Sequence, residues 1–377
     1  MSVRKEMDIG VVKEIKNQEY RVAFTPHHAL ELTQSGHRVL VENNAGIGSG
    51  FSNDHYYSSG AELCDTAQTW DADLVLKVKE PLAEEYAFLQ GQILFTFLHL
   101  AGTDPVLTEA LLDSKISALA YETLEDEHGR LPLLAPMSAI AGNMATQMGS
   151  YYLARIHGGK GVQLGRVLGA GHGKVLVVGD GVVGQHAATV ACALGAEVTI
   201  AGLFPERITV LKQQISPQLQ FIESTTGNIS AVIADADLVI GAVLCRGQKA
   251  PFVISESMVK TMQPGSVIVD VSIDQGGCIE TSRPTSHDHP VFVLHGVIHY
   301  CVTNMPGAFP RTSTLALTTA TWPYIERLVA GIMGGLKNDA VVLTAFNTYK
   351  GYVVNAAVAK SLGLNTRFRQ IDELLIA

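Results

Sequence analysis

Several polar side chains stand at the ends of otherwise apolar runs, where they could do chemistry. Lys79 and His99 each close an apolar run, Arg21 comes just before one, and Asp274 lies in the acidic, glycine-rich loop that follows another. A guanidinium can bind a carboxylate through two parallel hydrogen bonds. An imidazole is the side chain best suited to general acid–base catalysis near neutral pH. These residues therefore predict carboxylate binding at Arg21 and proton transfer at His99.

Each of these residues also has a structural interpretation, which the sequence leaves open. A charged loop residue can be solvated, a polar residue beside a buried strand can be a satisfied core residue, and an acid can cap a turn. The structural alternatives are a surface ion pair for Arg21, an edge strand whose exposed face carries Lys77 and Lys79, a core histidine for His99, and a turn and a helix cap for Asp270 and Asp274.

A glycine-rich turn gives the strongest signal in the chain. Residues 174–184 read Lys-Val-Leu-Val-Val-Gly-Asp-Gly-Val-Val-Gly, an apolar strand followed by glycines in G-x-G-x-x-G spacing, and a helix is predicted behind it over 185–194. Gly179 permits the turn, Gly181 lets backbone approach a pyrophosphate, and Gly184 lets helix and strand pack closely. The helix N-terminus offers N–H groups to the phosphates. The strand and helix around the glycines predict a dinucleotide site, although the glycines alone are a weak signal.

The elements that must position these residues alternate between short apolar strands and helices in both halves of the chain. This alternation predicts an α/β fold with mainly parallel sheets, and the second half has the order of a Rossmann unit. A proline-marked linker is expected over 131–136, and long helices over 137–156 and 312–336. The predicted strands cover 8–12, 38–42, 74–78, 93–98, 117–121, 175–178, 197–201, 238–243 and 266–271, and the shorter helices cover 26–35, 104–114, 185–194, 206–214 and 255–261.

The composition limits the class of protein. The chain has 377 residues, of which 47% are hydrophobic and 17% charged, so two domains with large cores are expected rather than disorder. The formal net charge is −9 and no basic stripe is visible, which argues against nucleic acid or an anionic membrane as partner. No uncharged apolar run reaches the roughly 20 residues of a membrane span, and the charged N-terminus lacks the apolar part of a secretory signal. A cytoplasmic protein is expected.

Cysteine and histidine spacing predicts no metal site. Five cysteines are widely spaced and form no C-x-x-C motif, so they are expected to be reduced thiols: Cys64, Cys192, Cys245, Cys278 and Cys301. The run His287-Asp288-His289 resembles a ligand cluster, but its spacing is too short for one helical face and prolines flank it. A structural loop is therefore preferred there.

Taken in order, these segments resemble the alanine dehydrogenase family, which shares a superfamily with the alpha subunit of proton-translocating transhydrogenase. The resemblance covers nearly the whole chain. It is carried by Lys13-Glu14, Arg21-Val22-Ala23, Thr25-Pro26, Leu76 to Pro81, Phe95 to Leu100, Leu133 to Ser138, Asp237 to Leu244, Ile273 to Gly277 and Tyr300 to Pro306.

Carried over position by position, the resemblance implies a role for each matching residue. Arg21 and Lys79 would bind the carboxylate and carbonyl oxygen of the substrate. His99 would donate and accept the proton, and Asp274 would be the second catalytic residue. The positions that match cofactor-binding residues are Ser138, Gly179, Gly181, Val182, Val183, Gly184, Ser224, Val243, Leu244, Val271, Ser272, Ile273, Arg283, Val302, Thr303, Asn304 and Met305. Gly202 and Arg207 are also expected to face the cofactor, although they do not follow the family pattern.

One position departs from the family pattern. The second Rossmann strand normally ends in an acid that binds the adenosine ribose hydroxyls, but here Gly202 stands there. Loss of that carboxylate removes repulsion against a 2′-phosphate, and Arg207 lies where a cation could meet one. Glu206 could instead act as a displaced acid. NAD is the expected cofactor, and NADP or dual use is a hypothesis.

The resemblance also implies a fold and an activity. It predicts two Rossmann-like, doubly wound domains separated by a cleft, with a substrate and catalytic domain from residues 1–132 plus 311–377 and a dinucleotide-binding domain from 133–310. The implied reaction is the reversible oxidative deamination of L-alanine to pyruvate and ammonia, with hydride transfer to a nicotinamide cofactor. The implied assembly is a cytoplasmic homohexamer that serves alanine catabolism.

Three other functions remain open at this point. A transhydrogenase hydride-transfer subunit would need a membrane partner, and Lys79 and His99 argue against it. A dinucleotide-binding relative that has lost catalysis is favoured only by Gly202. A reductase of the opine or lysine pathways would share related domains but take a larger substrate.

Overall fold

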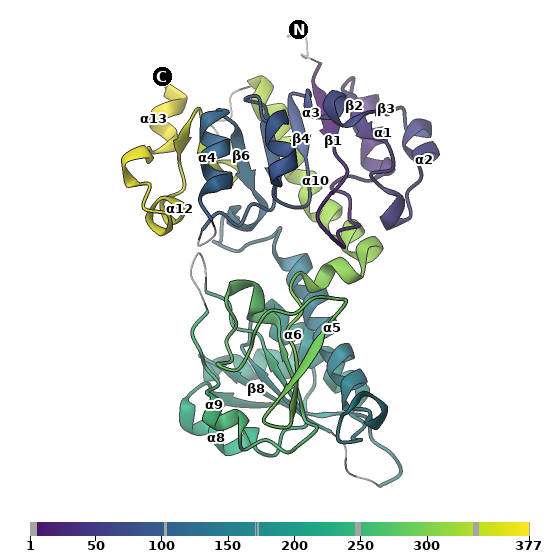
Figure 1. Cartoon of the computed structure of the whole chain (residues 1–377), viewed down its shortest axis with the longest axis vertical. Helices are drawn as coiled ribbons and strands as arrows, with labels where there is room; N and C mark the ends of the chain where they lie inside the picture. The colour runs from purple at the N-terminus through teal and green to yellow at the C-terminus, as the bar shows by residue number, and fades with distance from the viewer. Residues whose placement is uncertain are drawn as a thin grey trace. The chain divides into compact units, whose positions relative to one another are not determined.

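The structure of the protein, a computed structural model, describes residues 6–101, 104–169, 171, 173–245, 250–334 and 339–376. The chain divides into two compact units. The first unit combines Met1–Met137 with Gly307–Ala377, and the second unit is the continuous segment Ser138–Pro306. The colours of Figure 1 show the two segments of the first unit, in which the green-yellow helix α10 and the yellow C-terminal helices pack with the purple and blue N-terminal elements.

The first unit is built on an eight-stranded sheet whose order is β15-β14-β6-β5-β4-β1-β2-β3. The six N-terminal strands are parallel to one another, and β14 is antiparallel to both β6 and β15. Read from β3 to β6, this is the doubly wound order 3-2-1-4-5-6. The strands are β1 Asp8–Val11, β2 Arg38–Glu42, β3 Glu62–Cys64, β4 Leu74–Leu76, β5 Ile93–Thr96, β6 Ser117–Ala120, β14 Phe346–Tyr349 and β15 Tyr352–Val353.

Several helices of the first unit begin at recognisable capping residues. Thr25 caps the first of them, with Pro26 in the first turn, where its missing N–H costs nothing. Ser52 and Asp65 form capping boxes at the next two. The helices are α1 Pro26–Gln34, α2 Asn53–Ser58, α3 Thr66–Trp70, α4 Val106–Asp113, α10 Pro310–Gly334, α11 Ala340–Thr344, α12 Ala356–Ser361 and α13 Ile371–Ile376.

The second unit contains a seven-stranded sheet whose order is β12-β13-β11-β10-β7-β8-β9. All neighbours are parallel except β12 and β13, so the Rossmann order 3-2-1-4-5-6 appears again with one antiparallel edge strand. The strands are β7 Lys174–Val178, β8 Glu197–Gly202, β9 Gln220–Glu223, β10 Leu238–Gly241, β11 Val267–Asp270, β12 Val291–Leu294 and β13 Val297–Tyr300. The helices are α6 Val182–Leu194, α7 Ile208–Gln214, α8 Thr226–Ile233 and α9 Glu256–Val259, and α5 Ala135–Leu153 leads into the unit.

The central strands of the second unit are buried on both faces, as doubly wound sheets require. Val175 and Val177 of β7 pack into one core cluster, and Leu176 and Val178 pack into the cluster on the opposite face. This two-sided burial explains why the strand reads as a continuous apolar run.

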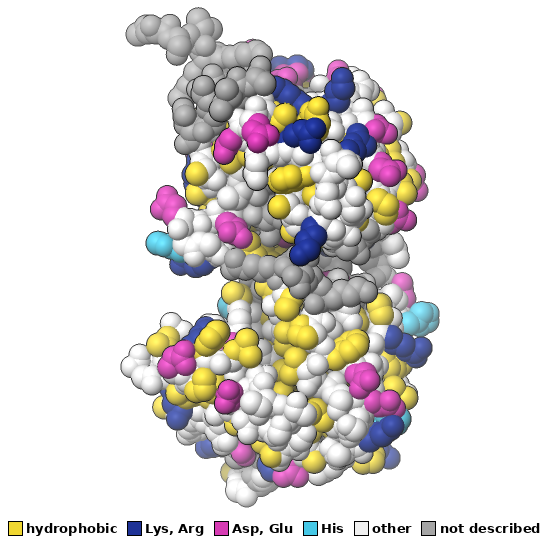
Figure 2. Space-filling view, turned by 90° about the vertical axis from the view of Figure 1, so that its left-hand side faces the viewer, with side chains coloured by type: hydrophobic (Ala, Val, Ile, Leu, Met, Phe, Trp, Pro, Cys, Tyr) yellow, Lys and Arg dark blue, Asp and Glu magenta, His cyan; other side chains and the backbone are white. Residues whose placement is uncertain are grey.

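On the face of the molecule in Figure 2, acidic and basic side chains are interspersed rather than gathered into one stripe.

The expected α/β fold with two Rossmann-like sheets is confirmed, and most predicted elements lie within three residues of their expected bounds. The linker expected over 131–136 is wrong in its last part, because α5 already begins at Ala135 and accommodates Pro136 in its first turn. Six short strands were not predicted from the sequence, namely β3, β9, β12, β13, β14 and β15.

Candidate functional site

Two loops that carry predicted substrate residues begin at the same edge of the first sheet. In the strand order of the first unit, the connections reverse direction between β1 and β4, and ligands of doubly wound sheets bind at such a switch point beyond the strand ends. Arg21 follows β1 and Lys79 follows β4, while His99 follows the neighbouring β5. The edge strand proposed as an alternative for the lysines is wrong, because β4 lies between β1 and β5.

Arg21 is a buried residue rather than a solvated one, with 2% of its surface exposed. Its Nε lies 2.6 Å from Oε1 of Glu19 and its Nη2 lies 2.5 Å from Oε2, so the guanidinium already holds a carboxylate of its own loop in the bidentate geometry. Its third nitrogen, Nη1, lies 3.1 Å from Sδ of Met137. Glu19, which the sequence analysis missed, thus fixes the direction of this guanidinium.

Lys77 and Glu14 form a buried ion-pair network directly beneath the candidate site. Nζ of Lys77 lies 3.1 Å from Oε2 of Glu14 and 2.8 Å from Oε1 of Glu85, and all three side chains are buried. Burial alone would lower the pKa of Lys77, but the two carboxylates outweigh it and raise the pKa, so the ammonium stays charged. The expectation that Lys77 and Lys79 share one face of the strand is wrong, because β4 ends at Leu76 and the side chain of Lys77 is buried in this network.

The same network positions the backbone of Lys79. Oε1 of Glu14 accepts the N–H groups of Val78 at 2.6 Å and of Lys79 at 3.3 Å. The hydroxyl of Thr96, at the end of β5, donates to the carbonyl of Lys79 at 2.8 Å. The loop that carries Lys79 is thus tied to the strand that leads to His99, and the half-buried Lys79 is held at the carboxyl ends of the strands.

His99 stands in a strained and exposed position, so the core alternative is wrong. Its φ is 50°, a conformation that non-glycine residues rarely adopt and that is concentrated at functional sites. Glu122 accepts the N–H of His99 at 2.6 Å and that of Leu98 as well, which holds the strained backbone in place. The imidazole stacks on Phe97 with ring centroids 5.6 Å apart. Glu122 is a positioning residue that the sequence analysis did not identify.

The glycine turn of the second unit has the shape that a pyrophosphate needs. Gly179 has a φ of 114°, and a Cβ there would lie 2.3 Å from the carbonyl of Ala242. A Cβ on Gly184 would lie 1.9 Å from the carbonyl of Gly179, whereas Gly181 faces open space with nothing within 4 Å. Gly181 also caps α6 without a side-chain hydrogen bond, which leaves the helix N–H groups to a ligand. These residues therefore fit a dinucleotide.

We expect Gly184→Ala to abolish tight NADH binding, because the added methyl would force the turn away from the helix. The matched control is Gly227→Ala in the first turn of α8, where a Cβ meets nothing within 4 Å. NADH binding measured by fluorescence titration, with thermal unfolding of each variant, checks this. Equal binding by Gly184→Ala and the wild type would contradict the close approach.

The ends of β10 and β11 lie beside this turn and are tied together by a residue predicted to bind the cofactor. The hydroxyl of Ser272 accepts the N–H of Val243 at 3.0 Å and donates to its carbonyl at 2.8 Å. Asp270 is buried and accepts the N–H groups of Ser272 and Cys278, so the turn interpretation holds for it. Burial raises the pKa of Asp270.

Asp274 differs from Asp270, because it is exposed at the loop that follows β11. Its two carboxylate oxygens lie 3.2 and 3.4 Å from the backbone nitrogen of Asn304. Asn304 has a φ of 55°, so a second strained residue stands at a predicted site position. The structure thus joins two residues that the sequence analysis named separately.

The other predicted cofactor residues are distributed around the same unit. Ser138 lies one turn before Gly142 on α5, and a Cβ on Gly142 would meet the carbonyl of Val183, so this face of α5 packs against the start of α6. The N–H of Ser224 donates to the carbonyl of Gly202 at 2.8 Å. Farther along the chain, Arg283 stacks on Phe292. Val182 and Leu244 are exposed, and Val271 to Ile273 and Val302 to Met305 occupy the loops after β11 and β13.

Gly202 ends β8 in surroundings that leave no room for a side chain. A Cβ there would lie 2.7 Å from Cζ of Phe221 and 2.9 Å from Cγ of Asp180. Nη1 of Arg207 lies 2.5 Å from Oδ2 of Asp180, so the cation expected to face a phosphate is paired with an acid of the glycine turn. Glu206, the other candidate acid, is exposed.

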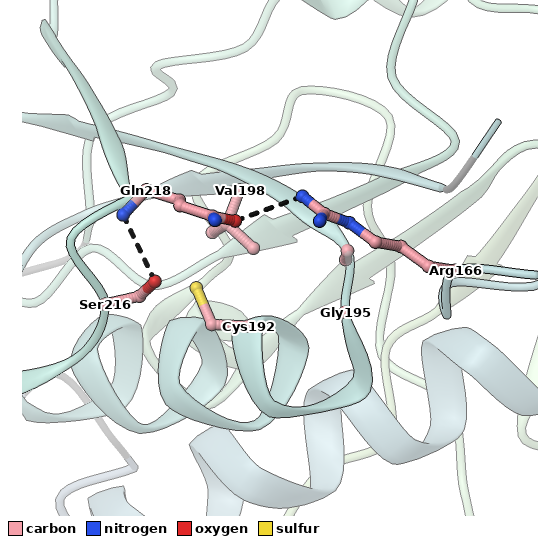
Figure 3. A pocket seen from close by; sticks show the side chains of 7 residues that line it. Arg166, Cys192, Gly195, Val198, Ser216 and Gln218 are labelled. Atoms are coloured by element: carbon pink, nitrogen blue, oxygen red, sulfur yellow. Dashed lines mark hydrogen bonds between the residues drawn. The ribbon is translucent and has the colours of Figure 1, made fainter. Parts of the chain in front are cut away.

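A pocket lies at the other end of these strands. Figure 3 shows Cys192 near the end of α6, Val198 near the start of β8, and Arg166 hydrogen-bonded to Gln218 at 3.1 Å. Burial raises the pKa of the Cys192 thiol, which keeps it protonated. Because Gly179 and Gly202 lie at the carboxyl ends of β7 and β8, this pocket is not part of the predicted dinucleotide site.

Two classes of feature are absent from the described residues. Within the ranges that the structure describes, no three histidine, cysteine or acidic side chains are grouped as metal ligands. In the same part of the chain, no helix is long and apolar enough to cross a membrane.

Known proteins resemble this chain over almost its full length. The family models "Alanine dehydrogenase/PNT" match with their N-terminal domain over residues 10–141 and their C-terminal domain over residues 145–356. Alanine dehydrogenase of Bacillus subtilis is 51% identical over 362 residues, covering 95% of each chain. Alanine dehydrogenase 2 of Staphylococcus aureus is 46% identical over 373 residues, covering 98% of this chain and 100% of the relative.

Solved structures agree with this result. An L-alanine dehydrogenase matches with a TM-score of 0.90 and 44% identity, covering 95% of this chain and 99% of its own. A transhydrogenase from Sinorhizobium meliloti matches with a TM-score of 0.79 and 25% identity, covering 93% of this chain and 99% of its own. With both family domains matched and relatives close to half identical, the chain belongs to the alanine dehydrogenase/PNT family.

Proposed function

We propose that this protein is an alanine dehydrogenase that catalyses the reversible oxidative deamination of L-alanine to pyruvate and ammonia. The observation that carries the proposal is the 51% identity to an alanine dehydrogenase across 95% of both chains. The transhydrogenase alternative is not favoured, since identity to the solved transhydrogenase is 25% against 44% for the solved L-alanine dehydrogenase. A catalytically inactive relative is also disfavoured by the retained Arg21, Lys79, His99 and Asp274.

A nicotinamide dinucleotide is the cofactor in this proposal, and when bound it supplies the acceptor for the hydride of alanine. Gly179, Gly181 and Gly184 with the N-terminus of α6 would hold its pyrophosphate, for which their geometry supplies a turn, open space and free N–H groups. Val243, Ser272 and the other predicted contacts at the ends of β10, β11 and β13 would hold the remainder.

The first unit supplies the substrate chemistry in this proposal. Lys79 and Arg21 would orient the alanine carboxylate, and an orientation effect of this kind contributes strongly to rate. His99 would move the proton during attack of water on the imine that hydride removal leaves. Support comes from three glutamates that hold these residues: Glu14 binds the backbone N–H of Lys79, Glu19 binds the guanidinium of Arg21, and Glu122 binds the backbone N–H of His99. Asp274 is proposed as the second catalytic residue.

We further propose a homo-oligomer, specifically a hexamer, that works in the cytoplasm in alanine catabolism. The family resemblance supports the assembly. The five cysteines are all free, which supports a reducing compartment.

The reaction and the cofactor choice are tested together by following reduced-nicotinamide absorbance with L-alanine and either NAD or NADP. We expect alanine-dependent reduction, with kcat/KM for NAD exceeding that for NADP by less than about a hundredfold, or ~2.7 kcal/mol, because Gly202 presents no carboxylate to repel a 2′-phosphate. A larger preference for NAD would contradict the dual use. Absence of alanine-dependent reduction with both cofactors would contradict the proposed function.

A further inference from the structure

The position that normally selects NAD has been rearranged in this chain. In Rossmann units an acid at the end of the second strand binds the ribose hydroxyls, and here Gly202 occupies that position. The structure explains why glycine is needed, because a Cβ at Gly202 would collide with Phe221 and with Cγ of Asp180. The carboxyl carbon of Asp180 thus lies 2.9 Å from the position of a Cβ at residue 202, where the usual acidic side chain would begin.

That carboxylate comes from the glycine turn itself. Asp180 is the residue between Gly179 and Gly181, and 9% of its surface is exposed. The side-chain amide of Gln185 donates to its carbonyl at 2.8 Å, which fixes the turn. Oδ2 accepts from Arg207, while Oδ1 makes no hydrogen bond to any part of the chain that the structure describes. One carboxylate oxygen is therefore left for a ligand at the sheet edge where the dinucleotide is proposed to bind.

We propose that Asp180 replaces the missing acid as the residue that binds the adenosine ribose, and that its ion pair with Arg207 sets the choice between NAD and NADP. This inference rests on the dinucleotide site of the proposed function. Asp180 accepts the ribose hydroxyls of NAD through Oδ1. When NAD binds, Arg207 neutralises the charge of Asp180. When NADP binds, the same guanidinium pairs with the 2′-phosphate, so NAD is preferred only modestly.

The test uses the full-length enzyme and two variants, each of which removes the charge of one partner of the ion pair. Asp180→Asn keeps the size of the side chain but removes its charge, so the ratio of kcat/KM for NAD to that for NADP should fall at least tenfold. In direct binding, its Kd for NADH should rise at least fivefold and its Kd for NADPH should not. Arg207→Gln should raise the Kd for NADPH at least fivefold and change the Kd for NADH less than twofold.

Asp235→Asn is the matched control, because it makes the same change of charge in the same unit at the opposite end of β7, where Asp235 pairs with Lys174. Thermal unfolding shows whether each variant is folded. If Asp180→Asn changes the Kd of both cofactors by the same factor, Asp180 only shapes the turn and the inference is overturned. If Glu206→Gln instead of Asp180→Asn weakens NADH binding, the acid has been displaced to Glu206 and the inference is also overturned.

The binding measurements separate this inference from the proposed function, because they contain no alanine. Wild-type enzyme that binds NADH through Asp180 but does not oxidise alanine would contradict the function and leave the inference standing. If the wild-type enzyme oxidises alanine but Asp180→Asn has the same ratio of kcat/KM for NAD to kcat/KM for NADP as the wild type, the inference is contradicted and the proposed function stands.

Discussion

His99→Asn is expected to reduce kcat for alanine oxidation by about a hundredfold to ten-thousandfold, the usual contribution of a positioned acid–base group. Lys79→Ala is expected to reduce kcat strongly as well, because it removes a cation that orients the alanine carboxylate. Asparagine is the informative replacement at position 99, because it tolerates the φ of 50° that His99 adopts and so leaves the strained turn intact. Lys79 contributes a charge at the sheet edge, which alanine removes without disturbing the buried Lys77 network. Steady-state kinetics with saturating alanine and cofactor measure the effect.

Cofactor binding should be preserved in both variants, since the predicted dinucleotide residues belong to the second unit. We expect the Kd for NADH to stay within about threefold of the wild-type value. His27→Asn, an exposed histidine that pairs with Glu31 on α1, is the control and should keep the wild-type kcat. A near-native kcat for either site variant would remove that residue from the mechanism.

Lys77→Met is expected to reduce the free energy of unfolding of the first unit by about 3–5 kcal/mol. Removal of this ammonium leaves the carboxylates of Glu14 and Glu85 buried together without a cation, and an uncompensated buried charge is costly. Urea unfolding followed by tryptophan fluorescence measures the first unit alone, because both tryptophans, Trp70 and Trp322, lie in it.

A surface ion pair supplies the control for this prediction. Arg38 pairs with Asp8 and Glu62 at the amino ends of β2, β1 and β3 of the same sheet, where the side chains are partly exposed, and Arg38→Gln should cause a clearly smaller loss of stability. The double variant Lys77→Met with Glu85→Gln should lose less stability than the two single changes added together, because the groups share one network. An unchanged unfolding midpoint for Lys77→Met would show that the network does not stabilise the unit.

Most parallel strands of both sheets could be predicted from the sequence because they are buried on two faces and read as apolar runs, whereas the parallel strands β3, β9 and β13 were missed. The antiparallel edge strands were missed although each hairpin has a signal. Their turns are His295-Gly296 and Lys350-Gly351, with φ values of 53° and 78° in the first and 48° and 84° in the second. Hairpin turns with two positive φ values favour Asn-Gly or Asp-Gly, so histidine and lysine in the first position conceal the pattern.

The positions of the candidate site residues followed from strand ends, but their environment did not. The solvated loop considered for Arg21 is wrong, because its buried side chain is held by Glu19, two residues away, while its role on a substrate carboxylate stays a prediction. Glu14 and Lys77 are 63 residues apart in sequence, so their pairing depends on β1 and β4 being neighbours. Contacts of this kind arise from tertiary topology, which local patterns do not encode.

The first unit is built from two separate segments of the chain, and this has a consequence for folding during synthesis on the ribosome. Every segment of the second unit has been translated once Pro306 is made, whereas the first sheet still lacks β14 and β15 near the end of the chain. Domains fold as units while the nascent chain grows. The second unit is therefore expected to acquire its native structure before the first unit does, and β6 remains an unpaired edge until β14 has been synthesised.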